Sequence, residues 1–317
     1  MNTRLLILLL CCSLNTHAQA VYNTGLERDM QSDAYARFNY QNDFFTATDY
    51  YFTQGVILEW AHPAFRRFFA CKVLLRPKDW QQTFGIGFEQ NGYTPTDYVP
   101  AQILYGDRPF AGTLSFKIFA IAKDTLKQQR LASALNIGVI GPLAGAGDIQ
   151  TYIHERTPNA LPHGWHNQVA NDLVLQYHAS YERNLLRLRD QLQIATFTMA
   201  NLGTISDKAG LGLTFMAGYF DNPFGTARRK KLRIYLYDRP ELSFVAYDAT
   251  LQGPLFNSSS PYTLSAGEIS RVVFRNNWGV VARLGKVYLE YYQSFMTREF
   301  KSGKDMRNGG IQIGVAF

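Results

Sequence analysis

Two polar side chains in the middle of the chain have the spacing of a general-base pair. Gln150 and His154 lie four residues apart, so a helix would place both on one face. An amide beside an imidazole can fix the ring's orientation and tautomer, which suits a histidine that takes a proton from water. The alternative is a surface histidine in a helix that follows the glycine-rich stretch 141–147. No Gly-Lys-Ser/Thr follows that stretch, so it does not predict a phosphate-binding loop.

A second polar group lies earlier in the chain. Asn42-Asp43 ends one alternating stretch and Thr53 opens the next, so a hairpin would return Thr53 toward the pair. Asp43 is the candidate metal ligand, because carboxylate oxygens bind a hard cation such as calcium, which would offset oxyanion charge. The alternative for Asn-Asp at a strand end is ordinary turn chemistry. The sequence has no Gly-x-Ser-x-Gly motif, so hydrolysis here would use water activated by His154 rather than a serine nucleophile.

The elements that must position these residues are β-strands. Apolar residues alternate with polar or small ones, as in Phe84, Ile86 and Phe88, and this two-residue period is that of a strand. The pattern recurs to the last residue, Phe317. It predicts about twelve strands, over 35–43, 52–61, 81–91, 111–123, 129–141, 172–184, 190–201, 210–220, 231–249, 267–283, 286–299 and 308–317.

These strands favour an all-β fold, an antiparallel transmembrane barrel. Each can cross a bilayer, which takes about 9–11 tilted residues, and twelve is an even number. The composition is 46% hydrophobic and 14% aromatic, with a mean hydropathy of −0.18, as a polar lumen behind an apolar wall would give. The alternative is a periplasmic β-sandwich, whose strands usually run to about 5–6 residues.

The N-terminus predicts export. Residues 1–20 combine a positive Arg4, an apolar run of leucines and a small-x-small end at Ala18-Gln19-Ala20, which is the pattern of a cleaved signal peptide. Residues 21–317 would form one barrel domain in the outer membrane. They hold a single cysteine, Cys71, so they form no intramolecular disulfide, and we expect this residue to be incidental in the turn after the second strand.

A barrel with both ends in the periplasm would bring the two polar groups together. Its outer loops would cover 44–51, 92–110, 142–171, 201–209, 250–266 and 300–307, with a short helix around 148–157. Asn42, Asp43, Thr53, Gln150 and His154 would then meet at one outer rim beside the outer leaflet.

Other motifs predict little chemistry. His163 and His166 lack cysteine or acidic neighbours at the spacing of a zinc site. The basic run 228–231 is typical of a solvated turn and falls on the periplasmic side of this topology. The net charge of +7 does not indicate nucleic-acid binding in an exported barrel.

From about Arg37 to the C-terminus the sequence resembles the outer-membrane lipid A 3′-O-deacylase family, LpxR. The resemblance rests on several spaced motifs in order. They are Asn42-Asp43, 49–55 (DYYFTQG), 107–112 (DRPFAG), 138–142 (GVIGP), Gln150, His154, Gly164-Trp165 and Asn167-Gln168.

The resemblance implies a twelve-stranded barrel that hydrolyses the ester of the 3′ acyloxyacyl group of lipid A, with calcium stabilising the oxyanion. It implies His154 as base supported by Gln150, with Asn42, Asp43 and Thr53 completing the site. Lipid A, as part of lipopolysaccharide, would be the substrate, and we expect a monomer among outer-membrane lipids. The family's second outer loop carries a lysine, whereas the corresponding stretch here is Tyr98-Val99-Pro100. The alternatives are a passive barrel and an outer-membrane phospholipase.

Overall fold

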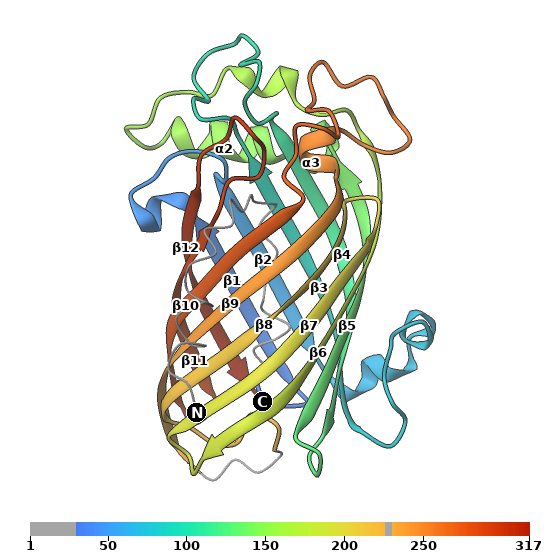
Figure 1. The fold of residues 1–317 in the computed structure, drawn as a ribbon, viewed down its shortest axis with the longest axis vertical. Coiled ribbons are helices and arrows are strands. Elements are labelled where there is room, and N and C mark those ends of the chain that lie inside the picture. Colours follow the sequence, from blue (N-terminus) through green and yellow to red (C-terminus); the bar gives the residue numbers. More distant parts are fainter. Residues whose placement is uncertain (1–29, 226–229) are drawn as a thin grey trace, which may run out of the picture.

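The computed structural model describes residues 30–225 and 230–317, which form a closed antiparallel β-barrel (Figure 1). Each strand pairs with its neighbours in sequence, and β12 closes the barrel on β1. The strands are β1 (Tyr35–Asn42), β2 (Gln54–Ala61), β3 (Gln81–Tyr93), β4 (Ala111–Asp124), β5 (Gln129–Ile140), β6 (Asp172–Leu188), β7 (Leu192–Gly203), β8 (Ser206–Tyr219), β9 (Leu232–Asp248), β10 (Val272–Leu284), β11 (Val287–Met296) and β12 (Met306–Ala316). The predicted twelve-stranded barrel is confirmed.

The two-residue period separates a wall from a lumen. In β11, Leu289 and Tyr291 are exposed on the outer wall, whereas Tyr288, Glu290 and Tyr292 are buried inside. Successive side chains of a strand point to opposite faces, so apolar residues cover the outer wall while the residues between them point into the lumen. This alternation explains the low mean hydropathy of a membrane-spanning chain.

Ion pairs fill the lumen. The Glu59 carboxylate accepts from Lys117 Nζ at 2.7 Å and also pairs with Arg37 from the neighbouring strand. Further along, Arg275 pairs with Glu241 at 2.9 Å. All five side chains are buried. These buried charges therefore neutralise one another inside the lumen.

The outer end of the barrel carries the long loops and the helices α2 (Ala146–His154) and α3 (Ala249–Gln252) (Figure 1). The predicted helix starts and ends earlier than expected, because Gly145 has a left-handed conformation (φ 67°) that begins the helix at Ala146. Helices in the described ranges are all too short or too polar to cross a membrane. The predicted signal peptide and the first half of the basic run 228–231 lie outside these ranges.

Two outer loops differ in length from the prediction. The expected loop 201–209 is a tight turn, since β7 runs to Gly203 and β8 begins at Ser206. The Asp207 carboxylate accepts from the Gly203 N–H at 2.8 Å, which closes the turn. By contrast, the loop after α3 extends to Arg271, so β10 starts five residues later than predicted.

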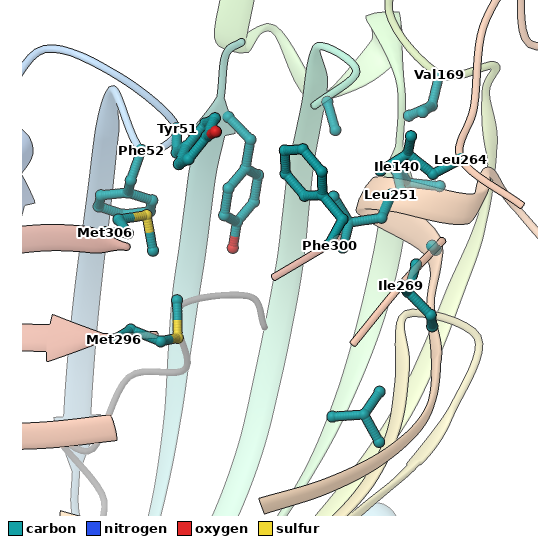
Figure 2. Packing of buried hydrophobic residues seen from close by; sticks show 14 of the residues in the cluster. Tyr51, Phe52, Ile140, Val169, Leu251, Leu264, Ile269, Met296, Phe300 and Met306 are labelled. Carbon is teal, nitrogen blue, oxygen red and sulfur yellow. The ribbon is translucent and has the colours of Figure 1, made fainter. Parts of the chain in front are cut away.

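An apolar cluster closes the outer end beneath these loops (Figure 2). Tyr51 packs on Phe300 with ring centroids 5.6 Å apart, and Phe52 packs on Tyr93 at 5.5 Å. Tyr51 has a left-handed backbone (φ 71°), which is costly for an aromatic residue and persists where packing enforces it. The cluster therefore fixes the end of the β1–β2 connection, which carries half of the candidate site.

Candidate active site

A cavity of about 480 Å³ opens at the outer end between the β1–β2 connection and α2. Its lining includes all five side chains that the sequence predicted for the site: Asn42, Asp43, Thr53, Gln150 and His154. Segments about a hundred residues apart thus meet in one pocket, as the sequence predicted.

Asn42 holds the β1–β2 connection in shape. Its Oδ1 accepts from the Phe44 N–H at 2.9 Å and caps the 3₁₀ helix Asp43–Thr46. Its Nδ2 donates to the Thr53 carbonyl and, at 3.2 Å, to the Tyr40 hydroxyl. Both ends of the side chain are therefore engaged, and Asn42 positions Asp43 and Thr53.

Asp43 and Asp49 place two carboxylates on the cavity wall. Asp43 is buried, and its Oδ2 has no hydrogen-bond partner. Burial first, and then repulsion by Asp49, raises the pKa of Asp43 to about 8. Asp49 accepts from the Tyr98 hydroxyl at 2.9 Å. Within residues 30–225 and 230–317, no salt bridge joins either carboxylate to a basic side chain.

The donor set around these carboxylates suits a hard cation. An orphaned carboxylate oxygen and a second carboxylate nearby are oxygen ligands of the kind calcium takes. In the described part of the chain, no group of three His, Cys, Asp or Glu residues could hold a metal. Any further ligands would have to be amide, hydroxyl or backbone oxygens, such as those of Thr53 and its neighbours.

His154 ends α2 and is oriented by the backbone. Its Nδ1 lies 2.7 Å from the Ala160 carbonyl oxygen. A carbonyl can only accept, so Nδ1 carries a proton, and in the neutral ring the lone pair is therefore on Nε2. The Tyr98 ring packs edge-on against the imidazole with centroids 5.3 Å apart. The histidine therefore has the tautomer of a general base.

Gln150 was expected to orient His154, but its hydrogen bond is to Trp165. Its Oε1 accepts from Trp165 Nε1 at 2.6 Å, and its Nε2 is buried without a partner. Gln150 thus shares the helix face of His154, but its oxygen is taken by Trp165, and the Ala160 carbonyl orients the histidine. Gly147 permits this arrangement, since a Cβ there would lie 2.8 Å from the Trp165 ring.

Sequence reasoning assigned no role to Asp49, Tyr98 or Trp165. Asp49 and Trp165 belong to motifs of the family resemblance, which was their only signal. Tyr98 lies in the second outer loop, and its hydroxyl donates to Asp49. The role of the Ala160 carbonyl could not be read from the sequence, because every residue has a backbone carbonyl. His166 lies apart from the cavity lining, with Nδ1 2.9 Å from the His163 carbonyl.

Comparisons with known proteins found a matching family and similar structures. The family model described as outer membrane protein LpxR matches residues 5–317. The structure of LpxR from Salmonella typhimurium is similar, with a TM-score of 0.74 at 18% identity, and the match covers 89% of this chain and 100% of that one. The β domain of the Bordetella autotransporter BrkA matches with a TM-score of 0.48 at 10% identity, covering 90% and 98%. No curated protein sequence matches this chain.

Proposed function

The chain belongs to the LpxR family of outer-membrane proteins, and we propose that it is an esterase that removes the 3′-linked acyloxyacyl group from lipid A. The observation that supports this most is the shared cavity of His154, Gln150, Asp43, Asn42 and Thr53. It opens at the outer end of the barrel, where the outer leaflet holds lipid A.

The chemistry follows from the atoms that the cavity leaves free. His154 Nε2 takes a proton from water as the water oxygen bonds to the ester carbonyl carbon. The same proton then passes to the sugar oxygen as the carbon–oxygen ester bond breaks. The products are a free acyloxyacyl acid and a 3′-hydroxyl. The Gln150 amide, unpaired at Nε2, is a donor for the oxyanion.

Calcium is the cofactor that we propose for this site. Asp43 and Asp49 would hold the ion, with an oxygen of Thr53 nearby. When bound, it supplies positive charge that stabilises an oxyanion. Asn42 would act by fixing Asp43 and Thr53 through its two hydrogen bonds.

Apolar side chains at the mouth suit a lipid substrate. Phe44 and Ile153 line the cavity and are also exposed to the outside. Acyl chains can therefore enter sideways from the membrane without crossing the polar loops. The cavity lining holds no lysine or arginine within the described ranges, so we expect contacts outside it to hold the sugar phosphates.

Mass spectrometry of lipid A tests the proposal. Cells that express wild-type protein should lose one acyloxyacyl mass, whereas His154→Ala and Asp43→Ala should leave lipid A intact. Excess chelator should abolish the wild-type activity. Identical spectra from all three proteins would contradict the esterase, and activity that persists in chelator would contradict the calcium role.

Two alternatives can be separated from this function. A passive barrel would need an open lumen, whereas two cavities inside this lumen are about 60 Å³ each and are lined mostly by polar and charged side chains. A phospholipase of the same fold would release fatty acid from glycerophospholipid. Presenting that lipid and lipid A in parallel to the purified protein distinguishes the two esterases.

A further inference from the structure

The connection between β2 and β3 is a long segment at the inner end of the barrel. Residues 62–80 contain two 3₁₀ helices, η3 (Pro63–Arg67) and η4 (Phe69–Lys72). In Figure 1 this light-blue segment lies outside the barrel, toward the end where the C-terminus lies. It is at the opposite end from the candidate active site, so the proposed function does not use it.

One face of the segment packs on the outer wall of the barrel. Cys71 and Leu74 are buried against Phe84, Ile118 and Ala120. Ile118 and Ala120 alternate in β4 with Lys117, which points into the lumen and pairs with Glu59, so they point outward. The segment therefore covers wall that lipid would otherwise contact, and Cys71 is a buried packing residue rather than an incidental one.

Hydrogen bonds fix the segment to the same wall. Ser133 of β5 is fully buried, and its Oγ donates to the Leu75 carbonyl at 2.9 Å. The Tyr177 hydroxyl of β6 accepts from the Leu75 N–H at 2.8 Å and donates to the Val73 carbonyl at 3.0 Å. Irregular backbone is tolerated beside lipid only where its polar groups are satisfied. These bonds meet that need, so the segment is a fixed part of the membrane-facing surface.

The opposite face of the segment is both aromatic and basic. Phe69 is 77% exposed, and Phe68, Val73 and Leu75 are exposed beside it. The segment also carries five basic side chains and one acidic residue, Asp79. Those basic side chains are Arg66, Arg67, Lys72, Arg76 and Lys78. Apolar bulk mixed with excess positive charge is typical of elements that lie in a membrane interface with anionic lipid.

A cavity of about 200 Å³ lies at the base of the segment. Arg66, Lys78 and Trp80 line it together with Gln82 and Asp33. The Asp33 carboxylate accepts from the Thr83 hydroxyl at 3.0 Å, and no salt bridge among the described residues involves Arg66 or Lys78. The cavity wall therefore carries two cations against one carboxylate. A phosphate between Arg66 and Lys78, beside an interfacial tryptophan, would have the surroundings of a lipid headgroup.

We propose that residues 62–80 dock anionic glycerophospholipid of the inner leaflet, with the headgroup phosphate between Arg66 and Lys78. The acyl chains would lie along Phe68, Phe69 and Leu75. The position at the inner end of the wall selects phospholipid as the occupant, since lipid A belongs to the opposite leaflet. The excess positive charge selects an anionic headgroup over a zwitterionic one.

Native mass spectrometry of the full-length barrel in detergent tests this docking. The barrel is titrated with phosphatidylglycerol or phosphatidylethanolamine of the same acyl chains. Wild type should prefer phosphatidylglycerol, and the double variant Arg66→Gln/Lys78→Gln should bind it roughly 25-fold more weakly, because each basic residue near an anionic surface contributes a factor of about five. Binding of phosphatidylethanolamine should change little.

The matched control is Lys127→Gln/Lys286→Gln, which removes the same charge from exposed turns at the same end of the barrel. It should bind phosphatidylglycerol as wild type does. The gel shift of the folded barrel reports whether every variant is folded. Equal wild-type affinity for the two lipids, retained binding by the Arg66/Lys78 variant, or equal loss in the control would each overturn the proposal.

Discussion

Two buried polar clusters lie beneath the outer loops, and they differ in how their charges are balanced. The first contains Arg108, which pairs with Glu299 and donates to the Thr250 hydroxyl at 2.6 Å, with its guanidinium 4.4 Å from the Tyr93 ring centroid. The second is the candidate active site, where Asp43 and Asp49 face each other's charge without a basic partner in the described ranges.

This contrast separates a structural cluster from a ligand site. A buried charge is tolerated where it is paired. An unpaired buried group shifts its pKa toward the neutral form or is stabilised by a bound ligand of opposite charge. The Arg108 cluster joins the second, fifth and sixth outer loops, because its guanidinium pairs with Glu299 and reaches the buried Asp248 through the Thr250 hydroxyl. The Asp43–Asp49 pair is costly by itself, and a cation would relieve it. The following predictions test that division.

The largest effect should come from His154→Ala. Loss of a positioned general base lowers the rate by about 10²–10⁴-fold, while the fold should persist because the ring makes one hydrogen bond to a loop carbonyl. Steady-state hydrolysis of purified lipid A measures it. His166→Ala, an exposed histidine apart from the cavity lining, is the control and should keep wild-type activity. Equal loss in both variants would remove His154 from the mechanism.

Arg108→Ala should act on stability instead. Removing one partner of a buried ion pair leaves Glu299 uncompensated and costs about 3–5 kcal/mol of unfolding free energy. Denaturant unfolding in lipid vesicles, followed by the gel shift of the folded barrel, measures this loss. Arg156→Ala breaks an exposed pair with Glu155 and should change little. A stable Arg108→Ala protein would contradict the structural role of this cluster.

The next largest effect should be on the pH dependence of the melting temperature, which should depend on Asp43. The pKa of Asp43 is raised from 3.8 to about 8, so between these values the folded state holds a proton that the unfolded chain has lost. Without calcium, the melting temperature should therefore fall as pH rises from about 4 to 8. Asp43→Asn, which cannot ionise, should flatten that decline, and added calcium should oppose it in wild type only. The same slope in the Asp43→Asn variant would exclude Asp43 as the cause.

Much of the architecture was predictable because the alternation of lumen and wall is strict. Every strand could be placed from its two-residue period, and the topology then put His154 and Asp43 at one rim. The loops were less predictable, since their contacts join residues far apart in sequence. Arg108 belonged to a recognisable motif, but nothing local indicated that it would pair with Glu299, 191 residues away. The folding of residues 62–80 onto the wall likewise depends on Ser133 and Tyr177.

The smallest effect should come from Trp165→Phe. This variant tests how much the Trp165–Gln150 hydrogen bond contributes to the candidate active site, as Arg108→Ala tests the ion pair in the Arg108 cluster. Phenylalanine keeps most of the packing on Phe110 but removes the donor to Gln150 Oε1. A neutral hydrogen bond contributes about 1 kcal/mol, so a freed Gln150 amide should lower kcat by about fivefold. Because the amide would serve the oxyanion, KM should change little, and Gln150→Ala combined with Trp165→Phe should be no worse than Gln150→Ala alone. Additive losses in the double variant would show that Trp165 acts on the reaction by a route other than Gln150.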